Sequence, residues 1–398
     1  MAASTSGARL REVNKVAVLA LIGRHGPISR ADIARRLGLS PPAVTAVTRA
    51  LLDAGIIHKT TDAQPRGGRP GELLAVVGQA AVAIGVKVAS GHLTGVRADL
   101  DGTILSSFEA PFDEAVANPF ESLARLLAPH LEGPQPLLGI GLGVPGFVDS
   151  ATDLVQAPLL GWRRMPLGGY LSQLLDLPVL VDNDVNTLAA YEHLYGLGRP
   201  YEDFLTITLG RGVGAAVVIG GDLRRGGHGA AGELGHLTLD AAGERCHCGK
   251  NGCLETYLSD DALARQAREA GIIGAGEGAD ELRAAADAGV AAAKQLYHVA
   301  GQRLGTVLAG FSVMLDPQAI LVSGEGSRAW PHVSEGFFQT FLLGTHLELG
   351  ERISVHVDPW DDAKWALGAA ALVLRAPFTH TAETGSDAVR ARLAGIAQ

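Results

Sequence analysis

All three cysteines of the chain fall within eight residues, and a histidine lies ten residues before the first of them. These residues are Cys246, Cys248, Cys253 and His236. Three thiolates and one imidazole form the closed tetrahedral set that structural zinc favours, and zinc-binding cysteines typically cluster at glycine-rich knuckles. The spacing therefore predicts a structural zinc site, in preference to three buried thiols that are adjacent by chance.

A second histidine, His247, is a rival nitrogen ligand. In an extended segment alternate side chains point to opposite sides, so Cys246 and Cys248 would face one way and His247 the other. We therefore prefer His236 as the fourth ligand. Four protein ligands leave no open position for an activated water, so the expected metal is structural.

Length and composition set broad limits on the class of protein. A chain of 398 residues has room for two or three domains. Cysteines committed to a metal leave none for a disulfide framework, which favours a reducing, cytoplasmic location. No apolar run approaches the roughly 18 residues of a membrane span. The run 16–22 is not followed by a small-residue cleavage site, so we do not expect a signal peptide.

The net charge of -9 hides an asymmetry. Residues 1–78 contain 11 Lys and Arg against 5 Asp and Glu, a balance of +6, which leaves 22 against 37, or -15, for the remaining 320 residues. A small basic module in front of a large acidic body predicts a polyanion-binding segment joined to a part with another role.

The basic segment has the pattern of a helix-turn-helix behind an amphipathic helix at about 10–23. Ser29 is the expected N-cap of a helix that ends at Gly38, and Ser40 caps a second helix with Pro41 in its first position. A buried stripe is expected on the second helix at Val44, Val47 and Leu51, with Thr45, Thr48 and Arg49 facing a DNA major groove.

Two strands are expected after these helices, at 56–60 and 73–77, around a loop that contains Arg66 and Arg69. The loop resembles a wing whose arginines enter a minor groove, where the negative potential attracts guanidinium groups. The alternative is a small helical protein-binding domain, since helix-turn-helix patterns give many false positives.

From residue 81 the pattern changes to a mixed α/β domain of the actin-like kinase kind. A three-strand meander is followed by alternating helices and strands, and a similar order begins again near residue 204. The expected strands are 82–88, 93–100, 104–108, 138–144, 178–181, 204–209, 213–219 and 319–322, and the expected helices are 119–131, 187–195, several over 259–315, and 363–375.

The chain resembles, over about its whole length, the ROK family of bacterial sugar kinases and sugar-responsive transcription regulators. The residues that carry the resemblance are Gly229-Ala-Ala-Gly-Glu233-Leu-Gly-His236, the cysteine cluster, Gly252-Cys253-Leu254-Glu255, and Asn183-Asp184-Val185-Asn186. Regulators of the family have a winged helix-turn-helix in front, whereas its kinases do not. The resemblance thus implies a regulator, with the sugar effector in the cleft between two lobes.

The resemblance also implies which residues bind the sugar hydroxyls. They are Asn183, Asp184, Glu233, His236 and Glu255, with His236 also a zinc ligand through its other ring nitrogen. For Glu233 and His236 the alternative is an ordinary helix-start carboxylate and a surface imidazole. We prefer the sugar-site interpretation, because an acid and an imidazole three residues apart share a helix face.

In the family's kinases the residue that matches Asp184 is the general base, and a motif Asp-x-Gly-Gly-Thr holds phosphate at the end of the first strand. Here that stretch is Lys87-Val88-Ala89-Ser90-Gly91, which differs at every defining position. Ala89 adds a Cβ where backbone approaches phosphate, and Lys87 reverses a charge. Gly210-x-Gly212-x-Gly214 persists as a second glycine-rich turn, which is weak evidence for a nucleotide site.

The sequence therefore predicts an α/β protein with an N-terminal winged helix-turn-helix at 1–78 and a two-lobed actin-like, ribonuclease H-like ROK domain at 79–398. Lobe one is expected at about 79–187 plus 364–398, and lobe two at about 188–363. The predicted function is a sugar-responsive repressor without kinase activity, which binds an inverted-repeat operator as a homodimer or homotetramer. The alternatives are an active sugar kinase with a fused DNA-binding domain, and a scaffold that binds only proteins.

Overall fold

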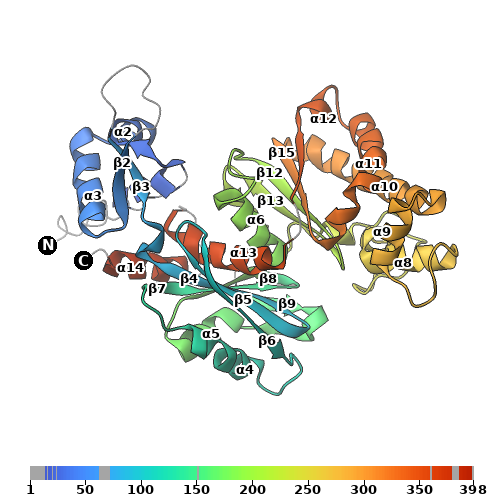
Figure 1. Cartoon of the computed structure of the whole chain (residues 1–398), viewed down its shortest axis with the longest axis horizontal. Coiled ribbons are helices and arrows are strands. Elements are labelled where there is room, and N and C mark those ends of the chain that lie inside the picture. The colour runs from blue at the N-terminus through green and yellow to red at the C-terminus, as the bar shows by residue number, and fades with distance from the viewer. Residues whose placement is uncertain are drawn as a thin grey trace. The chain divides into compact units, whose positions relative to one another are not determined.

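The structure is a computed structural model in which two compact units can be described separately. It describes residues 14–15, 17–19, 21–23, 25–61, 72–149, 152–358, 361–378 and 385–396. The first unit contains residues 1–199, 227–229 and 362–398, and the second contains 200–226 and 230–361. Each unit contains a five-stranded mixed sheet, and the first also carries the amino-terminal segment (Figure 1).

The amino-terminal segment has the element order of a winged helix. Ser29 caps α2 (Arg30–Leu37) by accepting a hydrogen bond from the amide of Asp32 at 3.1 Å, and Gly38 ends the helix with φ 62°. The second helix, α3 (Pro41–Asp53), starts after Ser40 as predicted. The three-stranded sheet has the order β1-β3-β2, with β1 (Ile28–Ser29), β2 (Ile57–Thr61) and β3 (Glu72–Val76).

The sheet of the first unit has the order β11-β7-β4-β5-β6. Its first three strands are parallel, and the meander strands β5 and β6 are antiparallel to their neighbours. The strands are β4 (Val82–Ala89), β5 (Gly91–Asp99), β6 (Ile104–Phe112), β7 (Leu137–Val144) and β11 (Val179–Asn183). The helices of this unit include α4 (Pro119–Leu127), α5 (Leu167–Leu175), α6 (Asp184–Leu194), α13 (Asp362–Arg375) and α14 (Ser386–Ile396).

Helix α13 lies directly against β4 and β7 (Figure 1). A Cβ on Gly141 of β7 would lie 1.8 Å from the carbonyl oxygen of Ala369, and one on Gly85 of β4 would lie 2.0 Å from that of Ala366. Only glycine permits such an approach of helix and strand backbones. The close packing fixes α13, and with it Trp365, against the strand that carries Lys87.

A small antiparallel sheet in the first unit lay outside the sequence prediction. It consists of β8 (Phe147–Asp149), β9 (Leu154–Ala157) and β10 (Trp162–Met165) in the order β10-β9-β8. These strands are only three or four residues long, shorter than the typical strand of about five to six residues, so they offer no extended alternation to detect. Val148, Val155 and Trp162 are buried and extend the core of the main sheet.

The second unit has a sheet of order β14-β13-β12-β15-β16. Its strands are β12 (Phe204–Leu209), β13 (Val213–Ile219), β14 (Asp222–Leu223), β15 (Ala319–Ser323) and β16 (Ser354–Val357). The helices are α7 (Glu255–Leu258), α8 (Asp260–Glu269), α9 (Ala279–Asp287), α10 (Ala291–Leu315), α11 (Trp330–Gly344) and α12 (Leu349–Arg352). The long helices α10 and α11 pack together, with Phe337 and Phe341 fully buried.

Each sheet presents polar residues where its strands end. In the first unit, β4 ends close after Lys87 and β11 runs directly into α6, whose first residue is Asp184. In the second unit the turn 210–212 joins β12 to β13. Ligands of open α/β sheets characteristically bind at the carboxyl ends of the strands. Within the described part of the chain, no helix is both long and apolar enough to cross a membrane.

Candidate functional site

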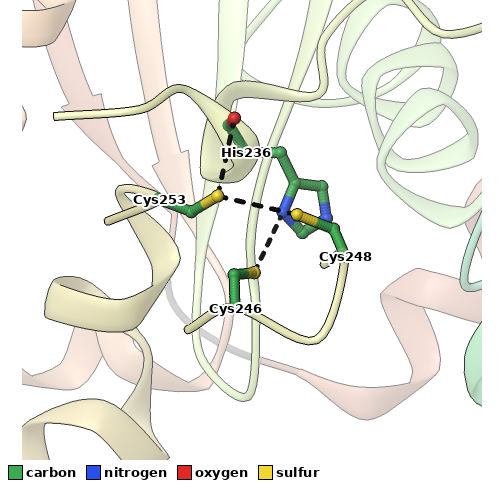
Figure 2. Close-up of side chains that lie close together, drawn as sticks. All are labelled: His236, Cys246, Cys248 and Cys253. Carbon is green, nitrogen blue, oxygen red and sulfur yellow. Dashed lines mark hydrogen bonds between the residues drawn. The ribbon is translucent and has the colours of Figure 1, made fainter. Parts of the chain in front are cut away.

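The four predicted zinc ligands converge in the second unit (Figure 2). Their ligand atoms all lie within 4.8 Å of one another. The Cys246 sulfur is 3.5 Å from Nδ1 of His236, and the sulfurs of Cys248 and Cys253 are 3.6 Å apart. Tetrahedral zinc with bonds of about 2.3 Å to sulfur places its sulfurs about 3.8 Å apart, so the side chains match the size of a zinc shell.

The backbone around the cysteines forms a tight knuckle. The amide of Cys246 donates to the carbonyl of Lys250 at 2.8 Å, and the amide of Gly249 donates back to the carbonyl of Cys246 at 2.9 Å. Gly252 has φ 63°, and a Cβ there would lie 1.6 Å from the carbonyl oxygen of Asp240. Glycine is therefore required at this position, which brings Cys253 back toward the other two sulfurs.

Burial shapes the protonation of the thiols. It raises the pKa of Cys246, and together with the neighbouring thiols it raises the pKa of Cys253 to about 12. Burial acts in the same direction on Cys248 and is the largest single effect there, but the hydrogen bonds from the backbone amide of Lys250 and from the thiols of Cys246 and Cys253 together outweigh it, so the pKa of Cys248 is lowered. Two of the thiols are thus protonated at neutral pH unless a cation compensates their ionised forms, as zinc does for thiolates.

The other nitrogen of His236 faces a carboxylate. Its Nε2 is 3.8 Å from Oε2 of Glu233, while Nδ1 lies on the sulfur side. Burial lowers the pKa of His236, which favours the neutral imidazole that binds metals. A ligand histidine whose second nitrogen faces a carboxylate is the usual arrangement at protein metal sites.

Glu255 joins the knuckle to the second glycine-rich turn. Its Oε2 accepts a hydrogen bond from the amide of Val213 at 3.2 Å, and its Oε1 lies 3.2 Å from Nδ1 of His247. His247 therefore pairs with Glu255, one of the predicted sugar-binding carboxylates. His236, His247 and Glu255 also bring their ligand atoms within 4.8 Å of one another, but this group contains no cysteine, whereas His236 is grouped with all three cysteines.

In the first unit, Asn183 and Asp184 lie at the junction of β11 and α6. The Oδ1 of Asn183 caps α6 by accepting from the amides of Val185 at 2.8 Å and Asn186 at 3.2 Å. Its Nδ2 donates to the carbonyl of Gly146 at 2.7 Å. Most of the amide's hydrogen-bonding capacity is thus used to build the site, whereas Asp184 is held in position at the first turn of the helix.

Lys87 reaches this junction from β4. Its Nζ lies 3.9 Å from Oδ2 of Asp184 and 3.6 Å from the centroid of the Trp365 ring. Only 22% of the Lys87 side chain and 16% of the Asp184 side chain are exposed, so the two charges face each other with little screening by water. Trp365 lies 278 residues after Lys87, and no pattern in the sequence predicts this contact.

The turn at residues 90–91, where the sequence predicts the counterpart of the kinases' first phosphate motif, holds a carboxylate. The amide of Gly91 donates to Oε2 of Glu114 at 3.0 Å, and the hydroxyl of Ser90 donates to Oε1 of the same side chain. These hydrogen bonds lower the pKa of Glu114. A carboxylate with two such donors occupies the hydrogen-bonding groups that a phosphate at this turn would use.

Acidic side chains also surround the second glycine-rich turn. Besides Glu255 on the amide of Val213, the carboxylate of Glu325 lies next to Gly210, and the amide of Asp260 donates to the carbonyl of Gly210 at 2.8 Å. Burial, followed by repulsion from Glu325, raises the pKa of Asp260 to about 6. The turn therefore lies in a negatively charged environment.

The raised pKa of Asp260 predicts a stability effect that depends on pH. Its folded value of about 6 exceeds the ordinary 3.8, so its contribution to stability is fully present below pH 3.8 and is lost as the pH rises through 6. We expect Asp260→Asn to raise the free energy of unfolding at pH 8 by about 1 kcal/mol, after allowance for solvent screening. Urea titrations at pH 5 and pH 8 measure this.

Asp261→Asn is the matched control, because Asp261 is exposed one position further along α8. It is expected to change the free energy of unfolding equally at both pH values. A benefit of Asp260→Asn that is larger at pH 5 than at pH 8 would contradict the assignment of a raised pKa.

The predicted DNA-reading face is corrected at one position. Thr45 and Arg49 are exposed on α3, but Thr48 is fully buried. Its hydroxyl accepts from Nε of Arg30 at 2.9 Å and lies 3.3 Å from the carbonyl of Thr45. Thr48 therefore ties α3 to α2 and is not available to a base edge. Arg66 and Arg69 lie outside the described residues.

These features define a class of protein. A winged helix-turn-helix precedes a fold of two α/β units, one of which carries a Cys₃His knuckle beside carboxylates at strand ends and glycine-rich turns. Proteins of this class join a DNA-binding module to a domain with the architecture of a sugar kinase.

The comparisons with known proteins identify the family. The ROK family pattern matches residues 83–376, and the MarR family pattern matches residues 12–66. The chain belongs to the ROK family. The alignments place a MarR-type DNA-binding region in front of the ROK domain, as the sequence predicted.

Curated relatives that match most of the chain are named as transcription regulators. The chain is 26% identical to the xylose repressor of Bacillus spizizenii, over 92% of this chain and 96% of that protein. It is 28% identical to the DNA-binding transcriptional dual regulator NagC of Escherichia coli, over 80% of this chain and 82% of that protein.

Solved structures of both regulators and kinases resemble the chain. A ROK family transcriptional regulator, described as a homologue of the E. coli MLC protein, covers 98% of this chain and 99% of its own with a TM-score of 0.80 and 26% identity. A ROK family glucokinase from Streptomyces griseus, solved with glucose and AMPPNP, covers 73% of this chain and 98% of its own with a TM-score of 0.63 and 29% identity.

Proposed function

We propose that this protein is a sugar-responsive transcriptional repressor of carbohydrate-metabolism genes. The observation that carries the proposal is that one chain contains both a winged helix module and a ROK domain. The same chain aligns with nearly the full length of a relative named as a repressor. Residues 1–78 bind operator DNA, and residues 79–398 bind a sugar. The sugar acts by its difference in affinity for two conformations, which is the only way in which a ligand can shift DNA affinity.

The sugar hydroxyls are bound by Asn183 and Asp184 of the first unit and by Glu233, His236 and Glu255 of the second. Carboxylates at loop and strand ends are the usual acceptors for sugar hydroxyls. The zinc proposed at His236 and the three cysteines supports this site without taking part in chemistry. It fixes the orientation of the imidazole, so that Nε2 remains on the side of Glu233.

We further propose that the chain does not phosphorylate sugars. Glu114 occupies the donors of the turn 90–91, and the cation of Lys87 stands where the kinase motif has an acid. Phosphoryl transfer depends on positioned hydrogen-bond donors and on a bound metal–nucleotide complex. The loss of one phosphate-binding turn therefore removes much of the catalytic power. Residues 210–214 and the likeness to a glucokinase favour the alternative, an active kinase with a DNA-binding module.

A coupled assay of ADP release separates these two functions. With MgATP and D-glucose, D-xylose or N-acetyl-D-glucosamine, we expect ADP to be released no faster than in the enzyme-free background. Turnover of about 1 per second or more, which is in the usual range of enzymes, would establish the kinase alternative.

DNA recognition tests the other half of the proposal. We expect Arg49→Ala to weaken binding of a selected operator duplex by about 10-fold and to leave the thermal midpoint unchanged, because the Arg49 side chain is exposed on α3. Fluorescence polarisation over a range of salt concentrations measures the affinity. Arg283→Ala, in helix α9 of the second unit, is the control and should bind as the unmodified protein does.

The proposed assembly is a homodimer or homotetramer that reads an inverted repeat, because a symmetric pair of modules matches a symmetric operator. The geometry of DNA recognition then depends on how the sugar alters the spacing of the paired modules.

A further inference from the structure

We propose that Lys87 is a sugar-contacting residue, and that Lys87 and Asp184 both form hydrogen bonds with one hydroxyl group of a neutral sugar. This inference rests on the proposed sugar-responsive function and names the ligand chemistry of one part of its site. The hydroxyl oxygen accepts a hydrogen bond from the Lys87 ammonium and donates its own hydrogen to the Asp184 carboxylate.

The distance between the two charged groups supports a bridging atom. At 3.9 Å, Nζ of Lys87 and Oδ2 of Asp184 are too far apart for a direct hydrogen bond. Two hydrogen bonds of about 2.8 Å that meet at one oxygen at about 90° to 110° place their outer atoms about 4.0 to 4.6 Å apart. The gap of 3.9 Å is at the short end of this range, so one bridging hydroxyl fits after a small outward shift of the Lys87 ammonium.

The surroundings hold Lys87 in this position. Its ammonium lies 3.6 Å from the centre of the Trp365 ring, and Trp365 is only 5% exposed. The ring is carried by α13, which packs against the strand of Lys87 so closely that Gly85 cannot carry a side chain. Because the Lys87 ammonium is already ordered between an indole face and a carboxylate, its side chain loses little conformational entropy when a ligand binds.

The opposite charges of Lys87 and Asp184 favour a neutral ligand group between them. Lys87 and Asp184 together carry no net charge, and both are largely buried. A neutral hydroxyl satisfies both partners because it is a donor and an acceptor at once. A phosphate of about -2 charge would gain the ammonium but would also be placed beside the Asp184 carboxylate, which repels it.

The experiment is isothermal titration calorimetry of the full-length, zinc-loaded protein. The probes are D-glucose, D-xylose and N-acetyl-D-glucosamine, then the monodeoxy derivatives of D-glucose and D-xylose, and finally D-glucose 6-phosphate. The variants are Lys87→Met, Asp184→Asn, the double variant, and Arg303→Met as a control. Arg303 also stacks over an aromatic ring, 4.3 Å from the centroid of Tyr257, but in the second unit.

We expect Lys87→Met to weaken the neutral sugar by about 10- to 100-fold, as loss of a hydrogen bond to a charged group does, and Arg303→Met to bind as the unmodified protein. The double variant should lose less than the product of the two single losses, because both side chains hold the same oxygen. One monodeoxy sugar should bind the unmodified protein more weakly than its parent, and this difference should disappear in Lys87→Met.

Three results would overturn the inference. Unchanged sugar affinity in Lys87→Met with loss in Asp184→Asn removes Lys87 from the site but leaves the sugar site intact. If D-glucose 6-phosphate binds the unmodified protein more tightly than D-glucose, and this difference in affinity disappears in Lys87→Met, the lysine binds an anion instead of a hydroxyl group. The absence of binding by every sugar probe to the unmodified protein removes both this inference and the proposed sugar response.

Discussion

Cys253→Ala is expected to abolish binding of the proposed zinc ion and to lower the free energy of unfolding by more than about 4 kcal/mol, as loss of a structural metal does. Cys253 is fully buried and its sulfur lies 3.6 Å from that of Cys248, so the substitution removes one of the four ligands from the middle of the cluster. Without a metal, the knuckle no longer fixes His236 and Glu255, and sugar binding is expected to disappear as well. Zinc content by mass spectrometry and urea unfolding by circular dichroism measure the two effects.

His247→Ala is the matched control, since His247 belongs to the same knuckle but is paired with Glu255. It should keep one zinc ion per chain, whereas His236→Ala should lose it. Loss of zinc from His247→Ala, with retention in His236→Ala, would show that the rival histidine is the fourth ligand.

The second large effect is expected from Asp184→Asn, which should weaken the sugar by at least about 10- to 100-fold and remove the sugar response. The carboxylate is the charged acceptor of the first unit, and asparagine keeps its shape without its charge. Operator affinity in the absence of sugar should stay within about two-fold, because Asp184 lies outside residues 1–78, which are proposed to bind the DNA. Titration of an operator duplex by fluorescence polarisation, with and without sugar, measures both properties.

Asp176→Asn serves as the control for this change. Asp176 is an exposed residue in the left-handed conformation at the end of α5, where asparagine is equally well accommodated. A sugar response that survives in Asp184→Asn, or that is lost in Asp176→Asn, would contradict the role given to Asp184. Glu233→Ala should reproduce the effect of Asp184→Asn from the second unit.

Local sequence patterns predicted most of the fold. The glycines and caps of the helix-turn-helix and the apolar runs of β4, β7, β12 and β13 act over a few residues, and the structure places these elements within two residues of the prediction. The repeated order of strands and helices then indicated the α/β class. Short strands such as β8 to β10 were missed, because three or four residues show no period.

The convergence of His236 with the three cysteines was predictable, because these residues are close in sequence and chemically distinctive. The surroundings of Asp184 were not. Glu114 reaches Ser90 from 24 residues away, and Trp365 reaches Lys87 from the far end of the chain. An ordinary glutamate and an ordinary tryptophan carry no motif, so only the packing of strands and α13 could bring them to the site.

Thr48 shows how tertiary packing overrides a helix face. Its position on α3 placed it with Thr45 and Arg49 on a polar stripe, but Arg30 from α2 reaches its hydroxyl and encloses it. Threonine can be buried at small cost when its hydroxyl is hydrogen-bonded, so periodicity alone did not distinguish a contact within the module from a contact with DNA.

The most direct test of a sugar-responsive repressor is selection of duplexes by the full-length protein from a random-sequence pool, followed by titration of the selected duplex with D-glucose, D-xylose and N-acetyl-D-glucosamine. The account predicts one enriched inverted repeat, and release of that duplex by one sugar with a change in affinity of about 5- to 150-fold. A pool that shows no enrichment, or a selected duplex whose affinity is the same with every sugar, would contradict it.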